Sequence, residues 1–318
     1  MKHLVVGPGA MSYFMFLGTL SALSDKGALN DLETVSGASA GSLLAFMYIL
    51  HKGDMSRMTE ESLSIPIQTL MKPNIKTLLT SYGFVKSKKI LALFKKITEP
   101  WCAYESPTFA QFYDHWPIKL YVSACCIDLS STHYFSVDTH PDMPIHEALC
   151  MSIAVPFLIQ SFKYKEWHYI DGGTLEETPC GAVIGVPPHE VHVIRMSGEY
   201  TARINSFKAY GYQLFCAACT LRHKYRQFPT TCIDTSDTDV FDFTLSTDAK
   251  VKLFVKGYTS CKTFHPRAEI DPLRRLDETQ TPCPEHPEPT YDAESDLLHT
   301  SQDPRDEQTS PLLQCISA

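Results

Sequence analysis

The feature that most constrains the fold of this chain is the segment Gly37–Gly41, which reads Gly-Ala-Ser-Ala-Gly. It lies between a strand-like run, Leu32–Ser36, and an apolar helix-like run, Ser42–Leu50. In a G-x-S-x-G motif between a strand and a helix, the serine occupies a sharp turn that exposes its hydroxyl, and the two glycines permit tight backbone packing. This context predicts Ser39 as a nucleophile, although the motif by itself also fits an ordinary small-residue turn.

Runs of apolar residues alternate between strand-like and helix-like along most of the chain. Further strands are predicted at His3–Val6, Leu120–Cys125, His133–Val137, Trp167–Ile170 and Val191–Met196. Further helices are predicted at Met11–Leu23, from Pro144 to near Pro156, and at Phe207–Arg226. This alternation predicts an α/β fold with a mostly parallel sheet, for which 318 residues at 44% hydrophobic composition supply a sizeable core.

Charge is distributed unevenly along the chain. The net charge is -8, but the segment 277–318 contains ten acidic residues, one arginine and six prolines. We therefore expect an acidic, proline-rich disordered tail there. The rest of the chain is nearly neutral and carries no signal for nucleic-acid binding.

The N-terminal residues and the cysteines bear on localisation. An apolar stretch follows Lys2, but Gly7, Pro8 and Gly9 would break the helix of a signal peptide, and cleavage would remove the first predicted strand. No apolar run reaches the ~18 residues of a membrane span. The odd number of cysteines, 11, favours reduced thiols. We expect a cytoplasmic or peripheral membrane protein that is not secreted.

A serine nucleophile needs a base, and Asp171 is the leading candidate. It ends the strand predicted at Trp167–Ile170 and precedes Gly172 and Gly173, which leave room for another backbone or a substrate. Asp-Gly is also a common hairpin turn, so this segment read alone favours a turn.

Backbone N–H groups that stabilise an oxyanion are expected at two turns. The segment Gly7–Ala10 separates the first predicted strand from the first predicted helix, where Gly9 and Ala10 could supply donors. Ala40, directly after Ser39, supplies a third. An ordinary strand-to-helix turn is the alternative interpretation.

The order of these motifs resembles the patatin-like phospholipases, and the resemblance spans roughly residues 3–265. It extends to four further segments, Leu120–Asp128, Met151–Pro156, Phe241–Ser246 and Val255–Tyr258. The resemblance implies a three-layer α/β/α sandwich and a Ser-Asp dyad, with Ser39 as nucleophile and Asp171 as general base. It also implies hydrolysis of acyl esters of phospholipids or neutral lipids without a metal or other cofactor.

The chain is expected to divide into three parts. Residues 1–183 are expected to form the patatin-like catalytic core, 184–270 the C-terminal part of the same α/β domain, and 277–318 the tail. One departure concerns the glycine turn, where the family pattern G-x-G-x-[R/K]-G has Met11 and Ser12 in its last two positions. Met11 and Ser12 motivate the alternative function, a patatin-like fold with weak or lost catalysis that binds lipid or acts as a scaffold. Pro8 also lacks an N–H to donate.

Several weaker signals lie outside these motifs. His189, His192, His223 and His265 follow Asp171 in the order of a Ser-Asp-His triad, but none lies in a recognisable motif. The pair Cys216 and Cys219 fits packing better than zinc, and the C-terminal Cys315–Ala318 only outlines a prenylation signal. The basic, amphipathic stretch Lys86–Lys96 is expected either to touch an anionic membrane surface or to pack one face on the core.

Overall fold

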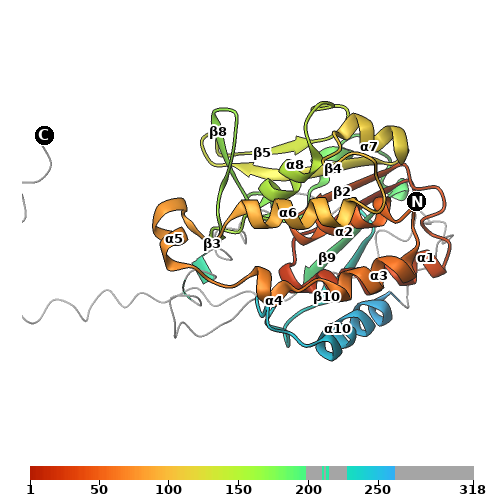
Figure 1. Cartoon of the computed structure of the whole chain (residues 1–318). Helices are drawn as coiled ribbons and strands as arrows, with labels where there is room; N and C mark the ends of the chain where they lie inside the picture. Colours follow the sequence, from red (N-terminus) through yellow and green to blue (C-terminus); the bar gives the residue numbers. More distant parts are fainter. Residues whose placement is uncertain (198–209, 211–212, 215–227, 262–318) are drawn as a thin grey trace, which may run out of the picture. The chain divides into compact units, whose positions relative to one another are not determined.

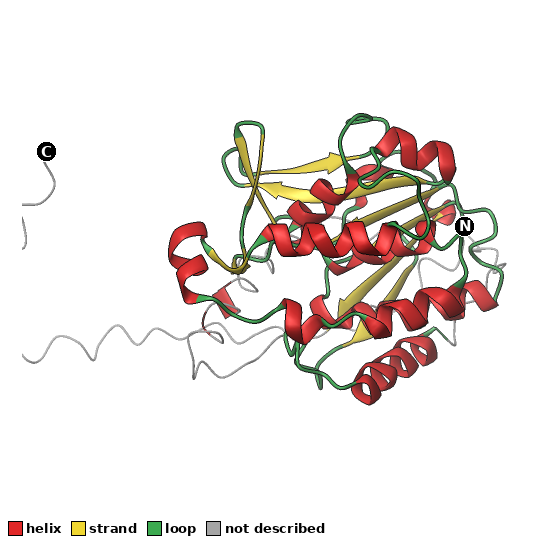
Figure 2. Cartoon of the chain, in the orientation of Figure 1, coloured by secondary structure: helices red, strands yellow, loops and turns green. Residues whose placement is uncertain are grey.

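The computed structural model describes residues 1–197, 210, 213–214 and 228–261, all within one compact unit, Met1–Glu269. The predicted helix Phe207–Arg226 falls almost wholly outside these described residues, and the predicted tail 277–318 does so entirely. Within the described part of the chain, helices flank a central sheet (Figures 1 and 2). This is the α/β architecture expected from the sequence.

The bounds of the elements are as follows. The strands are β1 (His3–Val6), β2 (Thr34–Ala38), β3 (Gly83–Val85), β4 (Lys119–Cys126), β5 (Ser131–Phe135), β6 (Phe157–Ile159), β7 (Phe162–Tyr164), β8 (Trp167–Ile170), β9 (Val191–Ser197) and β10 (Thr230–Asp234). The α-helices are α1 (Tyr13–Asp25), α2 (Ala40–Leu50), α3 (Met55–Ser64), α4 (Ile67–Leu70), α5 (Ile75–Ser81), α6 (Ser87–Thr98), α7 (Phe109–His115), α8 (Ile145–Ser152) and α10 (Thr247–Ser260). The 3₁₀ helices are η1 (Ala10–Ser12), η2 (Gly172–Thr174), η3 (Cys180–Val183) and η4 (Pro188–Glu190).

The central sheet has the strand order β10-β9-β1-β2-β4-β8-β7, and β5 also pairs with β4. The pairs from β10 to β4 are parallel, whereas β5, β8 and β7 pair antiparallel. β5 overlaps both β2 and β8 in its register along β4. Since one edge of a strand accepts one partner at each position, β5 occupies one edge of β4, and β2 and β8 share the other.

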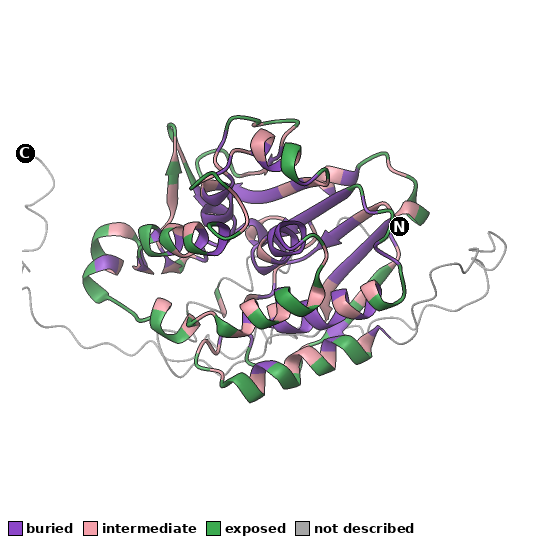
Figure 3. Cartoon of the chain, turned by 45° about the vertical axis from the view of Figure 1, so that its right-hand side comes forward, coloured by how far each residue is buried: buried purple, intermediate pink, exposed green. Residues whose placement is uncertain are grey.

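The core follows the alternation of side chains along the strands. Leu4 and Val6 of β1 point into the main core, while Val5 points to a smaller core on the opposite face. The main core is lined by α2, of which all residues but Leu43 are buried (purple in Figure 3). A helix that is apolar on all sides is stable only when it is buried, which explains the composition of this segment.

Most of the strands predicted from the sequence are confirmed, with small shifts at their ends. Trp167–Ile170 forms β8 as predicted, and His3–Val6 forms β1. The helix predicted from Met11 begins at Tyr13, because Ala10–Ser12 forms a 3₁₀ turn first. The strand predicted to run to Val137 ends at Phe135, because the N–H of the next residue donates to the side chain of Thr139.

Helices α3, α4, α5, α7 and α10 were not predicted from the sequence. In the sequence, α3, α4, α5 and α6 all lie between β2 and β4 (Figure 1). None of the helices in the described part of the chain combines the length and apolar character needed to cross a bilayer.

Candidate active site

Ser39 lies in a sharp turn between β2 and α2. Its backbone has φ 54° and ψ -123°, a conformation that is strained for any residue with a side chain. A Cβ at Gly37 would lie 2.4 Å from the N of Ser42, and one at Gly41 would lie 2.3 Å from the carbonyl oxygen of Val6. Both glycines are therefore required for α2 to begin so close to the ends of β1 and β2.

Hydrogen bonds hold the backbone of Ser39 on both sides. Its N–H donates to the hydroxyl of Ser152 over 2.9 Å, and its carbonyl accepts from the hydroxyl of Ser42 over 2.6 Å. Ser152 was not predicted from the sequence as a site residue. The sequence pointed to Ser152 only through the segment Met151–Pro156, which resembles the family. The hydrogen bond itself depends on how α8 packs beside α2, and a local pattern does not show that packing.

The sheet topology brings Asp171 to Ser39. β2 ends with Ala38 opposite Ser123 of β4, and β8 ends with Ile170 opposite Cys125 of the same strand. Because β2 and β8 run toward each other along one edge of β4, the residues that follow them meet at the gap between their ends. The Ser39 hydroxyl lies near enough to the Asp171 carboxyl group there to lower its pKa, although no hydrogen bond of normal geometry joins the two side chains.

Asp171 is almost completely buried, with 1% of its surface exposed. Its N–H donates to the carbonyl of Ala154 over 3.0 Å, and its Oδ1 accepts the N–H of Gly173 over 2.8 Å. Its Oδ2 makes no hydrogen bond of normal geometry to the described residues, so the contact with the Ser39 hydroxyl is a loose one.

Burial raises the pKa of Asp171 from 3.8 to about 7, because removal from water disfavours the charged carboxylate. The nearby Ser39 hydroxyl and the hydrogen bond from the Gly173 N–H lower the pKa, but they only partly offset the desolvation. Near neutral pH the carboxyl group therefore exists in both protonation states, which is the condition for efficient proton transfer in either direction.

The two glycines after Asp171 allow close packing against two other parts of the site. A Cβ at Gly172 would lie 2.2 Å from the carbonyl oxygen of Ser123, and one at Gly173 would lie 2.6 Å from the ring of Pro8. The Asp171 turn therefore rests on β4 and on the glycine turn at once. Pro8, which cannot donate an N–H, contributes this contact instead.

Most N–H groups of the glycine turn are already hydrogen-bonded. Gly7 donates to Ile194, Met11 to Val240 and Ser12 to Gly9, over 2.7 to 2.9 Å. The N–H groups of three other residues form no hydrogen bond to the described part of the chain, namely Gly9, Ala10 and Ala40. These are the three donors predicted for the oxyanion.

The turn has a second strained residue, since Ala10 has φ 44°. Ala10, Ser39 and Ala40 all line the same pocket, so the free donors at Ala10 and Ala40 border the cavity that Ser39 also lines. Ala40 is also the first residue of α2, where the helix dipole favours negative charge.

Met11 and Ser12, the departures from the family pattern, are both buried. The Met11 side chain lines the pocket and belongs to the main core, while its N–H is engaged by Val240. Neither substitution removes a free backbone donor from the turn. The effect of Met11 is to make one wall of the pocket apolar where the family pattern has a cation.

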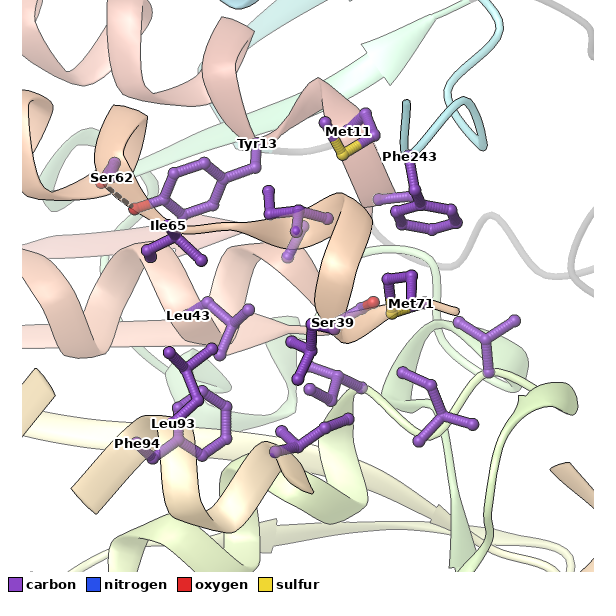
Figure 4. A pocket seen from close by; sticks show the side chains of 18 of the residues that line it. Met11, Tyr13, Ser39, Leu43, Ser62, Ile65, Met71, Leu93, Phe94 and Phe243 are labelled. Carbon is purple, nitrogen blue, oxygen red and sulfur yellow. Dashed lines mark hydrogen bonds between the residues drawn. The ribbon is translucent and has the colours of Figure 1, made fainter. Parts of the chain in front are cut away.

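The pocket beside Ser39 has a volume of about 150 Å³ and a lining that is almost entirely apolar. Its walls come from α1, α2, α4, α6 and residues beside these helices. The lining side chains include Leu43 of α2, Leu93 of α6, Ile65 and Met71 on either side of α4, and Phe243 from the segment between β10 and α10 (Figure 4). The hydroxyl groups of Tyr13 and Ser62 also line it, and they satisfy each other by a hydrogen bond of 2.8 Å. A cavity of this size and lining holds a hydrocarbon group about as large as benzene.

The histidines and cysteines considered from the sequence lie partly inside and partly outside the described residues. His189 is exposed in η4 and His192 is buried in β9, and no described histidine forms a hydrogen bond with Ser39 or Asp171. The other two histidines considered for a triad and the three cysteines considered for zinc binding or prenylation lie outside the described residues. They are His223, His265, Cys216, Cys219 and Cys315.

The basic stretch Lys86–Lys96 forms most of α6, and its apolar face packs inward. Ile90 and Phe94 are buried and line the pocket, so this face cannot lie on a membrane. The expectation that one face packs on the core is therefore confirmed, while contact of the exposed lysines with an anionic membrane surface stays a prediction.

The chain is similar in sequence to a known family and to two viral proteins. Residues 4–184 match the sequence model of a family described as patatin-like phospholipase. The chain is 28% identical over 191 residues to probable lipid hydrolase 463L of Invertebrate iridescent virus 6, and 26% identical over 176 residues to uncharacterized protein R571 of Acanthamoeba polyphaga mimivirus. These matches cover 58% and 54% of this chain, and 63% and 58% of the viral proteins, so the chain spans about three-fifths of the length of these relatives.

A solved structure shares the fold. The crystal structure of VipD from Legionella pneumophila has a TM-score of 0.54 and 17% sequence identity to this chain, over 81% of this chain and 65% of VipD. At this level of identity the similarity extends to the fold alone.

Proposed function

This chain belongs to the patatin-like phospholipase family, and on that premise we propose that it is a lipid acyl hydrolase that cleaves carboxylic esters of phospholipids or neutral lipids. The observation that carries the proposal is the contact between Ser39, in its strained turn, and the buried Asp171, beside an apolar pocket. Serine as nucleophile and a carboxylate as base are sufficient groups for acyl transfer when the two are within reach.

In the proposed reaction, the Ser39 hydroxyl oxygen attacks the ester carbonyl carbon while its proton passes to the Asp171 carboxylate. The carbonyl π electrons move to oxygen, and the resulting oxyanion accepts hydrogen bonds from the N–H groups of Gly9, Ala10 and Ala40. Collapse of this intermediate expels the alcohol, which takes the proton from Asp171 and leaves Ser39 acylated. Water then attacks the acyl carbonyl carbon and gives a proton to Asp171. When this second intermediate collapses, the bond from the acyl carbon to Ser39 Oγ breaks, Ser39 takes the proton back from Asp171, and the fatty acid leaves.

The raised pKa of Asp171 supports this role. A carboxylate with an ordinary pKa of 3.8 is too weak a base to accept a serine proton efficiently, whereas one with a pKa of about 7 is matched to neutral pH. The buried position that raises the pKa also excludes bulk water from the proton-transfer path.

The free donors of the glycine turn favour an active enzyme over the catalytically weakened alternative. Losing one oxyanion donor typically lowers the rate by ~10²- to 10³-fold. Here Met11 and Ser12 change side chains, while the N–H groups of Gly9 and Ala10 stay available. We therefore expect the departure from the family pattern to alter substrate fit rather than to abolish turnover.

A fluorophosphonate probe, which phosphonylates activated serines, tests the proposal. We expect stoichiometric labelling of the folded protein, mapped by mass spectrometry to Ser39, and loss of labelling in Ser39→Ala. The Ser56→Ala variant, at an exposed serine of α3, is the matched control and should label like wild type. Folded wild-type protein that does not label at Ser39 would favour a lipid-binding or scaffolding role.

A further inference from the structure

The segment from α4 to α6 carries charge of one sign only. Between Glu61 and Glu99 the chain contains seven lysines and no acidic residue or arginine, in a protein whose net charge is -8. Five of these lysines are exposed and form no ion pair with a described residue, namely Lys72, Lys76, Lys86, Lys88 and Lys89. A local positive surface of this kind attracts an anionic partner.

The same segment exposes large apolar side chains. Ile75 and Leu79, on α5, are 69% and 77% exposed, and Tyr82, which follows the helix, is 75% exposed. Phe157 of β6 is 44% exposed and pairs with Gly83 of β3, so it lies beside Tyr82. We call these four residues the α5 apolar tip; α5 is largely green at one end of the described elements in Figure 3.

Two of the four residues have a left-handed backbone conformation, which is unfavourable for bulky side chains. Tyr82 has φ 59° and Phe157 has φ 65°, in the region where glycine is preferred over any bulky residue. Because these aromatic side chains are exposed, their burial does not offset this conformational cost within the folded chain. Their presence is explained if they are buried against something outside the chain.

The α5 apolar tip borders the pocket beside Ser39. Leu158, which follows Phe157, lines that pocket, and so does Met71, four residues before Ile75. Met71 and Leu158 are therefore the part of the pocket lining that is nearest to the tip along the chain, and we call these two residues the pocket rim.

We propose that the α5 apolar tip and its five lysines form a docking surface for an anionic lipid bilayer, with the tip inserted among the acyl chains and the lysines at the headgroups. Apolar side chains surrounded by lysines are the composition of a surface that lies at a membrane interface. In this arrangement α6 supplies lysines while its own apolar face lines the pocket. The inference rests on the proposed function in one respect, because it treats the pocket rim as the entrance for lipid.

Flotation of the full chain with vesicles tests the docking surface. Wild type is expected to bind vesicles of phosphatidylcholine plus phosphatidylserine, and to bind those of phosphatidylcholine alone much more weakly. The double variant Ile75→Ser/Leu79→Ser should lower the affinity at least about tenfold. Lys72→Gln/Lys76→Gln should lower it by about tenfold on the anionic vesicles only.

Matched controls separate this surface from general stickiness. Val251→Ser/Val255→Ser, at exposed apolar residues of α10, and Lys252→Gln should bind vesicles like wild type. Wild type that fails to bind the anionic vesicles would overturn the proposal and leave a protein partner as the occupant of the tip. Equal binding by wild type and Ile75→Ser/Leu79→Ser would overturn it as well.

Two further measurements separate this proposal from the proposed function. Ile75→Ser/Leu79→Ser should hydrolyse a dissolved short-chain nitrophenyl ester like wild type, because neither residue lines the pocket. Ser39→Ala should lose that hydrolysis but bind anionic vesicles like wild type. If wild type binds vesicles yet hydrolyses no ester, the docking surface stands and the proposed activity falls.

Discussion

Ser39 and Asp171 lie at the same gap in the sheet, but the folded structure imposes a different kind of energetic cost on each residue. Ser39 bears backbone strain, with φ 54°, while Asp171 bears the cost of burying a carboxyl group that has a pKa of about 7. Backbone strain does not depend on pH, whereas the cost of burying a carboxylate appears only when the group ionises. The two contributions can therefore be separated by experiment.

The largest effect is expected at Ser39. Ser39→Ala should reduce ester turnover by ~10⁴-fold or more, because the proposed nucleophile is lost. Ser39→Gly should lose turnover equally and also raise the free energy of unfolding by roughly 1 kcal/mol, because glycine relieves the strain. Ser39→Ala is the matched control that keeps the strained backbone. Denaturant unfolding that finds both variants equally stable would contradict the strain at Ser39.

Asp171→Asn should lower turnover by ~10²- to 10⁴-fold, as expected for loss of a general base. It should also raise the free energy of unfolding by roughly 1–3 kcal/mol at pH 8. In wild type, the raised pKa of Asp171 costs nothing below about pH 3.8, where the carboxyl is protonated in both states. The cost grows as pH rises to about 7 and is constant above that.

Denaturant unfolding between pH 4 and 8 measures this dependence. The difference in stability between Asp171→Asn and wild type should grow with pH, while Asp31→Asn, at an exposed residue, should show no such trend. A difference that does not vary with pH would mean that Asp171 keeps an ordinary pKa.

The pH profile of wild-type turnover examines the same group during catalysis. If Asp171 must be ionised to accept the serine proton, kcat/KM on a dissolved ester should rise to a plateau with an apparent pKa of about 7. At pH 5 it should be about a hundredfold below the plateau. A flat profile from pH 5 to 8 would argue against Asp171 as the base.

The smallest effect is expected at Ala10, the second strained residue that lines the pocket. Ala10→Gly keeps the backbone N–H and relieves a φ of 44°, so turnover should stay within a few-fold of wild type. The free energy of unfolding should rise by about 0.5–1 kcal/mol. A large loss of turnover would show that the alanine methyl group, rather than the N–H alone, shapes the pocket.

Local signals made much of this site predictable. The strand-turn-helix context of Ser39 and the strand before Asp171 were visible in the sequence, because β-propensity and the steric freedom of glycine act over a few residues. The segment α3 to α5 was not predicted, since its helices are short and carry few apolar residues at regular spacing. The pocket wall that α3, α4 and the residues beside them form was therefore not predicted either.

Other features depend on contacts between distant segments. The hydrogen bond from Ser39 to Ser152 and the capture of the Met11 N–H by Val240 join residues far apart in the chain. From the sequence alone, the apolar face of α6 fitted contact with a membrane surface as well as packing on the core. Packing against α8 and the pocket turns it inward, so the exposed apolar surface belongs to α5.

The sequence by itself determined the family, the α/β alternation, and which serine and aspartate are candidates, because each of these is written in short motifs and in their order. Only the tertiary structure decided that β2 and β8 share one edge of β4 and so bring Ser39 to Asp171. It also decided that Asp171 is buried deeply enough to have a pKa of about 7. Desolvation depends on which distant segments exclude water from a group, and no local pattern in a sequence encodes that.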